Sequence, residues 1–163
     1  MRAEDAARKD KLIAERYLSS TEYASARTIF LYLSTPREAG TRLILERALS
    51  DGKQVFLPRV HGEEMLLVPY AAGDPLTVGA FGISEPTGEP SREVPDLAVI
   101  PLLAFDRTRA RLGKGKGYYD RFLALYTGRS VAIAYAEQET ECVPTDPFDR
   151  RPDVILTDRE RIV

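Results

Sequence analysis

Apolar and polar positions alternate along the chain in a way that predicts helices and strands in turn. Residues 2–18 place Ala6, Ile13 and Tyr17 on one face at helical spacing. Residues 28–33 form a continuous apolar run rich in β-branched and aromatic side chains, which predicts a buried strand. The same reasoning predicts strands at 54–60, 65–70, 96–105, 131–135 and 154–157, and a helix at 118–126.

Start and stop signals refine these elements. Ser19 and Glu22 have capping-box spacing, so a short helix or turn is expected there. Thr41 is a candidate cap for a further helix that Gly52 would end. Pro58 lacks a backbone donor, which places the end of strand 54–60 at an edge or an exit from the sheet.

Two connections differ in character. Residues 61–64 read as a tight turn that joins strands 54–60 and 65–70 into a hairpin. Residues 71–96 are rich in glycine and proline, and we expect a long loop with little regular structure. Loops of that length are uncommon in compact domains and often carry function.

The alternation of helices and strands predicts one α/β domain over residues 1–163 with a mainly parallel sheet. The near-continuous apolar run at 96–105 supports this fold class. Strands covered on both faces lose the polar positions that a solvated face would need.

Composition narrows the possible functions. The 163 residues carry 23 basic and 25 acidic side chains, a net charge of −2, so no global field favours nucleic acid or membrane. The single cysteine, Cys142, excludes a disulfide framework, and the single histidine, His61, excludes multi-histidine metal sites. The N-terminus has no apolar core of a signal peptide, and no apolar run is long enough to span a membrane, so we expect a cytoplasmic protein.

Residues 106–120 carry the richest chemistry. They follow the most apolar strand and precede a helix, a place where α/β sheets bind ligands. Gly113, Gly115 and Gly117 allow backbone N–H groups to approach an anion, and Lys114 and Lys116 add positive charge, so the segment favours phosphate. The spacing is neither that of a Walker A loop nor that of a dinucleotide-binding fingerprint.

Other interpretations of this segment remain open. It could be a basic, solvated connector. It could also be an RNA-binding patch in which Tyr118 and Tyr119 stack on bases. That patch would use five basic residues, namely Arg107, Arg109, Arg111, Lys114 and Lys116.

A divalent metal would need carboxylates near the phosphates. Asp120 stands on the first turn of the predicted helix, where it could hold Mg²⁺ against a bound triphosphate or simply favour the helix N-terminus. Asp149 and Asp153 both precede the last strand, and spacing alone does not choose between them as the second ligand.

The run RLGKGKGYYD at 111–120, after PLLAFD at 101–106, resembles the 5-formyltetrahydrofolate cyclo-ligases, also called methenyltetrahydrofolate synthetases. Further matches follow the family's order over most of the chain: GKQVFLPRV at 52–60, Met65, GAFGISEP at 79–86, AYAEQ at 134–138 and FDRRPDVILTDRE at 148–160. The resemblance implies a three-layer α/β/α fold similar to ribose-5-phosphate isomerase and the CoA transferases.

The resemblance also implies a reaction and a site. ATP and Mg²⁺ would drive the cyclisation of 5-formyltetrahydrofolate to 5,10-methenyltetrahydrofolate, with release of ADP and phosphate. Lys116 and Arg111 would carry catalysis, Asp120 and Asp149 would hold the metal, and Leu33 and Glu38 would contact folate. The nucleotide loop would comprise Arg111, Leu112, Gly113, Lys114, Gly115, Lys116, Gly117, Tyr118 and Tyr119, of which 114–118 would also touch folate.

The sequence departs from the family pattern in four places. The basic K-x-x-L-R segment that contacts ATP is not found, so we expect that the usual beginning is missing. Gly40 stands where the family often has Asp, and Leu102 replaces a glycine. Arg109 stands where the family has glycine, so a positive φ there would strain the backbone. A binding homologue with impaired turnover is the alternative function, and we expect a monomer or weak homodimer.

Overall fold

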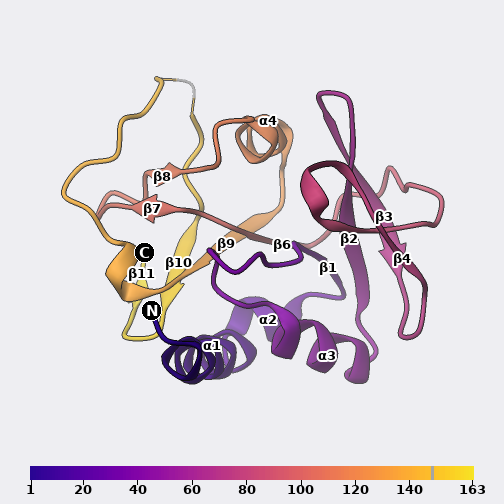
Figure 1. Ribbon diagram of the computed structural model, residues 1–163, viewed down its shortest axis with the longest axis horizontal. Helices are drawn as coiled ribbons and strands as arrows, with labels where there is room; N and C mark the ends of the chain where they lie inside the picture. Colours follow the sequence, from indigo (N-terminus) through magenta and orange to yellow (C-terminus); the bar gives the residue numbers. More distant parts are fainter. Residues whose placement is uncertain (148) are drawn as a thin grey trace.

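The computed structural model describes residues 1–147 and 149–163. A seven-stranded sheet runs through it in the order β11-β10-β9-β6-β1-β2-β3 (Figure 1). Its strands are β1 (Thr28–Leu31), β2 (Gln54–His61), β3 (Glu64–Tyr70), β6 (Leu97–Ile100), β9 (Arg129–Ala134), β10 (Val154–Thr157) and β11 (Arg161–Ile162). The five inner strands pair in parallel, and β3 and β11 close the two edges antiparallel.

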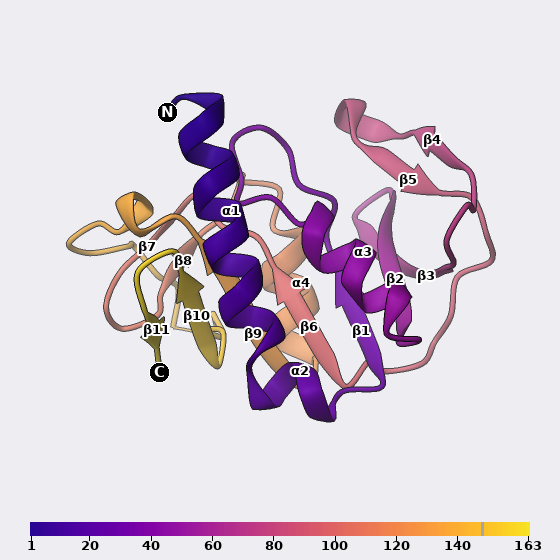
Figure 2. The same cartoon turned by 90° about the horizontal axis from the view of Figure 1, so that it is seen from below.

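Helices cover both faces of the sheet. They are α1 (Ala3–Leu18), α2 (Thr21–Ser25), α3 (Arg42–Ser50) and α4 (Tyr118–Leu125). The chain winds outward from β1 to β2 in one direction and from β6 through β9 to β10 in the other. Because parallel crossovers are right-handed, this reversal puts α3 and α4 on opposite faces. Helices α1 and α2 join α3 on the first face, which Figure 2 shows from below.

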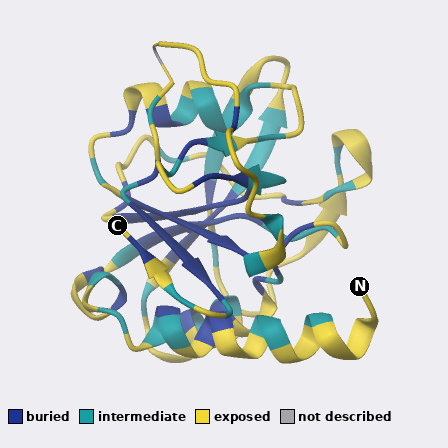
Figure 3. Cartoon of the chain, turned by 90° about the vertical axis from the view of Figure 1, so that its left-hand side faces the viewer, coloured by how far each residue is buried: buried dark blue, intermediate teal, exposed yellow. Residues whose placement is uncertain are grey.

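Side-chain alternation along the strands builds a separate core on each face. On the side of α1–α3, Ile29 and Val99 pack with helix residues such as Ile13. On the side of α4, Phe30 and Ile100 pack with Leu123. Figure 3 shows the central strands buried between the two helical layers. The three-layer α/β/α expectation is confirmed.

Most predicted elements are present within a residue or two. The strand expected at 154–157 is β10, and the hairpin of β2 and β3 closes at residues 61–64. Pro58 lies beyond Phe56, the last β2 residue paired with β1, so its missing donor interrupts only an outer ladder. The short helix after α1 is α2, although its cap is Ser20 rather than Ser19, and the Ser20 side chain accepts the Tyr23 N–H.

Two expectations about local structure were wrong. Segment 71–96 is not a featureless loop, because β4 (Leu76–Val78) and β5 (Ser84–Pro86) form an antiparallel pair around a 3-10 turn at Ala80–Gly82. The strand expected over 96–105 ends at Ile100, and the chain then pairs β7 (Ala104–Phe105) with β8 (Arg111–Leu112). Pro101 has no N–H to continue the central ladder, which explains the break.

Within the described ranges, no helix is both long enough and apolar enough to cross a membrane.

Candidate active site

A cavity of about 590 Å³ opens at the carboxyl ends of the parallel strands. One wall follows β1 at Tyr32 and Leu33, and the facing wall follows β6 at Pro101 and Leu102. These are the strands between which the chain reverses direction, the usual location of ligand sites in open α/β sheets. Parts of 58–65, 80–85 and 111–120 complete the lining.

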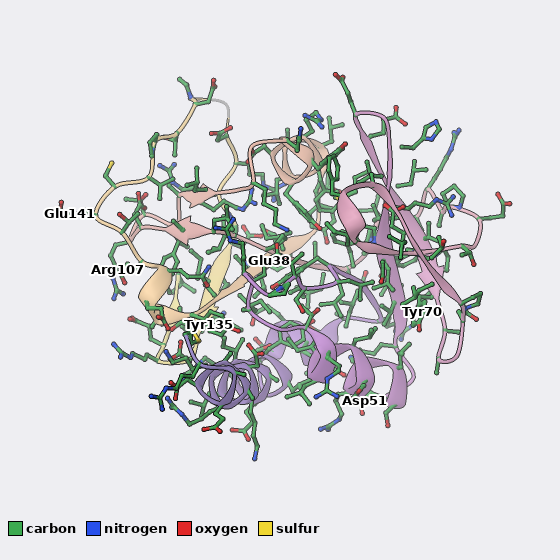
Figure 4. All side chains as sticks on the ribbon, viewed as in Figure 1. Glu38, Asp51, Tyr70, Arg107, Tyr135 and Glu141 are labelled. Carbon is green, nitrogen blue, oxygen red and sulfur yellow. The ribbon has the colours of Figure 1, made fainter. Side chains whose placement is uncertain are left out.

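The loop after β1 presents a buried carboxylate to this cavity. The Glu38 side chain is 5% exposed, and its Oε1 accepts the Thr35 N–H at 2.8 Å. The Glu38 N–H donates back to the Thr35 carbonyl at 3.0 Å, so a tight turn holds the residue. Lys114 Nζ from the facing loop lies 3.6 Å from Glu38 Oε1. The pair spans two walls of the cavity, and Figure 4 labels Glu38 near the middle of the molecule.

The glycine–lysine loop forms another wall. Gly115 and Gly117 have φ values of 91° and 73°, the left-handed region that side chains rarely adopt, and Gly117 begins α4. The start of α4 is tied to the β2–β3 turn, since the Tyr118 hydroxyl donates to the Gly62 carbonyl at 2.7 Å. Lys116 has no carboxylate partner within the described residues, and its ammonium lies 5.4 Å from the Phe81 ring centroid.

Arg111 is a buried cation beneath this loop. Its side chain is 4% exposed, and it forms an ion pair with Asp120 at 3.0 Å and donates to the Pro101 carbonyl at 3.0 Å. Burial lowers the pKa of the Arg111 guanidinium, while the negative charges of Asp120, Asp149 and Glu38 oppose that shift. Burial also raises the pKa of Tyr119 above its usual value. The Arg111 guanidinium is thus stabilised by its direct ion pair with Asp120 and by longer-range attraction to Asp149 and Glu38.

The structure separates the two candidates for a second metal ligand. Asp153 accepts the Ser130 N–H at 2.9 Å, which ties it to the amino end of β9, away from the cavity. Asp149 acts on Arg111 electrostatically, together with Asp120. No group of three potential metal ligands occurs among residues 1–147 and 149–163. Mg²⁺ nonetheless takes as few as one or two carboxylates when substrate phosphates supply the rest, and the carboxylate of Asp120 lines the cavity where it could serve such an ion.

The cavity brings together most of the site residues expected from sequence. Those that line it are Leu33, Glu38, Arg111, Gly113, Lys114, Lys116, Gly117, Tyr118, Tyr119 and Asp120. Leu112, Gly115 and Asp149 belong to neighbouring segments but do not line it. The Leu112 side chain is exposed on β8, and Gly115 serves the turn of the loop.

Sequence reasoning assigned no role to several other lining residues. Arg37, Phe81 and Glu85 contribute polar or aromatic groups. The Glu85 carboxylate accepts the Val60 N–H at 2.7 Å, which attaches β5 to β2. Phe81 is exposed at a φ of 62°, an unusual conformation for a large side chain. For Phe81 and Glu85, the signal in the sequence is the glycine- and proline-rich composition of 71–96. That composition predicts a functional loop but does not indicate which of its residues face the ligand.

The structure does not support the RNA-binding interpretation of residues 107–116. Of the five basic residues in its patch, Arg111 is buried against Asp120. Arg107 binds Glu139 and Glu160, and Arg109 donates to the Pro152 carbonyl. Lys114 and Lys116 are the exposed cations of this set at the cavity, so these five residues do not form one continuous basic surface.

Two departures from the family pattern have a structural explanation. Arg109 has a φ of 68°, so it occupies the strained conformation expected where the family has glycine. At Gly40, the missing side chain leaves room for the Asp10 carboxylate of α1, whose Oδ1 accepts the Gly40 N–H at 2.9 Å.

Comparisons with known proteins agree with this geometry. The model of the 5-formyltetrahydrofolate cyclo-ligase family matches residues 1–158. A probable 5-formyltetrahydrofolate cyclo-ligase of Schizosaccharomyces pombe is 30% identical over 89% of this chain and 81% of its own. The Haemophilus influenzae enzyme of that name is 31% identical over 86% and 80%.

A solved structure extends the likeness to three dimensions. The 5,10-methenyltetrahydrofolate synthetase of Aquifex aeolicus superposes with a TM-score of 0.88 at 33% identity. The match covers 99% of this chain and 84% of that one. The chain belongs to the 5-formyltetrahydrofolate cyclo-ligase family and is a ligase of that kind.

Proposed function

We propose that this enzyme uses ATP and Mg²⁺ to convert 5-formyltetrahydrofolate to 5,10-methenyltetrahydrofolate, with release of ADP and phosphate. One observation carries the proposal. A buried carboxylate, Glu38, and a glycine–lysine loop share one cavity, with Lys114 and Glu38 only 3.6 Å apart. The first suits the hydrogen-bond donors of a pterin, and the second suits phosphates.

The folate would enter against the loop that follows β1. Glu38 would accept hydrogen bonds from the amino-pterin edge, and Leu33 would pack against the ring. Residues 114–118 would bound the folate on its other side. In this arrangement the ion pair between Lys114 and Glu38 would weaken, and the Lys114 ammonium would contact the bound ligands.

The triphosphate would lie along 111–119. Backbone N–H groups and Lys116 would bind its oxygens, and the N-terminal end of α4 adds a partial positive charge. Asp120 and Asp149 would hold Mg²⁺, which supplies charge neutralisation between the phosphates. Arg111 pairs with Asp120 at 3.0 Å and would orient that carboxylate.

The reaction itself asks for positioning and charge, not for a protein nucleophile. The formyl oxygen attacks the γ-phosphorus and ADP leaves. N10 then attacks the activated formyl carbon and loses its proton, and the carbon–oxygen bond breaks as phosphate departs. Lys116 and the loop would neutralise the oxygens that gain charge in these steps.

The direct test is an assay of the purified chain with 5-formyltetrahydrofolate, ATP and Mg²⁺, followed by the near-ultraviolet absorbance of methenyltetrahydrofolate. We expect ATP-dependent product. Lys116→Ala removes a phosphate contact without breaking an internal ion pair, so turnover should fall by about 100-fold or more. Lys11→Ala, an exposed change on α1, is the matched control. If turnover is undiminished in Lys116→Ala, the proposal that this loop binds the phosphates of ATP is wrong.

A further inference from the structure

The loop that carries Glu38 is held from outside the cavity by a side chain of the first helix. Asp10, on α1, accepts two hydrogen bonds on a single oxygen. The Gly40 N–H donates to its Oδ1 at 2.9 Å, and the Tyr135 hydroxyl donates to the same atom at 2.6 Å. Helix α1, the loop after β1 and the end of β9 therefore meet at one carboxylate.

Gly40 is shaped to admit that carboxylate. A Cβ at this position would stand 2.4 Å from Asp10 Oδ2, which is far inside contact distance. The backbone of Gly40 is not among the positive-φ glycines, so the glycine is needed for space and not for an unusual turn. The Asp10 carboxylate can therefore approach this backbone closely only because residue 40 has no side chain.

The same contacts reach both walls of the cavity. The Tyr135 hydroxyl also lies 3.5 Å from the Glu38 carbonyl, and both residues are labelled in Figure 4. The Tyr135 N–H donates to the Gln138 side chain, whose amide donates to the carbonyls of Leu102 and Leu103 at 3.2 Å each. The turn at 135–138 thus connects the Glu38 loop to the segment after β6.

We propose that Asp10 is a positioning residue for the folate site. It holds Glu38 in place through its hydrogen bonds with Gly40 and Tyr135. The proposal rests on the assignment of Glu38 to folate, made above. Asp10 does not line the cavity, so it acts only through the loop. Its loss would let residues 38–40 move relative to the 101–103 wall, and small misplacements of a binding group are costly.

The test compares Asp10→Ala, Gly40→Ala and the double variant by steady-state kinetics. Asp10→Ala should raise KM for 5-formyltetrahydrofolate about 10-fold, with KM for ATP within about 2-fold of the unmodified chain. Gly40→Ala should do the same because its methyl group collides with the carboxylate. In the double variant the methyl occupies the vacated space, so the combined effect should be smaller than the product of the two.

Asp5→Ala is the matched control, since Asp5 lies on the same helix and its side chain forms an exposed ion pair with Arg8. Hydrogen exchange of the Gly40 amide provides a readout that needs no turnover. Exchange should accelerate in Asp10→Ala and not in Asp5→Ala. If Gly40 exchange is unchanged in Asp10→Ala, Asp10 does not hold the loop, and the proposal fails whatever the substrate is. Effects of the two substitutions on KM that simply multiply would overturn it as well. Faster exchange with an unaltered KM for 5-formyltetrahydrofolate would show that Asp10 holds the loop without positioning Glu38 for folate, which also overturns the proposal.

Discussion

The two ends of the parallel strands treat charge in opposite ways. At the amino ends, a smaller hollow of about 300 Å³ is lined by Glu22, Asp96 and Arg129. These groups satisfy one another or the backbone. Arg161 and Arg129 bind Glu22 at 2.6 and 3.5 Å, and Asp96 accepts the backbone N–H groups at the start of β1.

At the carboxyl ends, some of the cations that face the larger cavity are not neutralised by a carboxylate. Lys116 and Arg37 line it and have no carboxylate partner among the residues that the structure describes. The difference teaches that the pairing of charges, as well as volume, distinguishes a structural hollow from a ligand site. The amino-end charges stabilise the fold, whereas the carboxyl-end charges leave binding capacity for an anionic ligand.

The largest test of this contrast changes one aspartate at each end. Asp120→Asn removes a proposed metal ligand and leaves the buried Arg111 without its paired anion, so turnover should fall by about 100-fold or more and stability should drop. Asp96→Asn should lower stability while the folded protein keeps its activity. Initial rates and thermal unfolding of both variants make the comparison, and an active Asp120→Asn would break it.

A second test separates the two aspartates that precede β10. We expect Asp149→Asn to raise the Mg²⁺ concentration needed for half-maximal rate by about 10-fold. Asp153→Asn should leave that requirement unchanged and lower stability by about 1 kcal/mol, because a neutral amide oxygen accepts the Ser130 N–H more weakly than the carboxylate does. Magnesium titrations of the rate would show this, and equal shifts in both variants would contradict the separation.

A smaller effect concerns pH at the amino ends. The hydrogen bond from Arg161 lowers the pKa of Glu22 from 4.5 to about 2. A depressed carboxyl pKa stabilises the fold above about pH 4.5, and that contribution is lost as pH falls toward 2. Glu22→Gln should therefore cost about 1–2 kcal/mol at neutral pH, since both arginines are partly solvated. Denaturant unfolding across pH should show the difference vanish in acid, and a constant difference would argue against an ionic origin.

The smallest effect isolates backbone strain. Arg109 has a φ of 68° and one side-chain hydrogen bond to the Pro152 carbonyl. Both Arg109→Gly and Arg109→Ala lose that bond, but only glycine relaxes the left-handed conformation. Arg109→Gly should be more stable than Arg109→Ala by about 1 kcal/mol, measured by chemical denaturation. Equal stabilities would mean that the turn at 106–110 relaxes on its own.

Patterns of local sequence predicted much of this architecture. The continuous apolar runs of β1 and β6 and the helical spacing in α1 determine which face each residue buries, so the element order and the parallel sheet followed. The short pairings were missed because β4, β5, β7 and β8 have too few residues to show a period.

From residue types alone, the site was predictable only where one segment holds its chemistry; Leu33 and Glu38 were named through the family resemblance. Gly115, Lys116 and Gly117 adjoin in sequence, and their phosphate preference follows from residue type. Glu38 is ordinary in sequence, and its burial depends on partners far along the chain. The contact between Asp10 and Gly40 cannot be read from either residue alone, because it is made by the packing of α1 against the loop.

The reversal between β1 and β6 has a consequence for the order of folding. Ile29 pairs with Leu97, so the two walls of the cavity come from segments separated by the whole of α3, the β2–β3 hairpin and the β4–β5 ribbon. Closing so long a loop is entropically expensive and slow. The two walls of the cavity therefore come together only when β6 has paired with β1, and a nascent chain that lacks β6 has no cavity at this place.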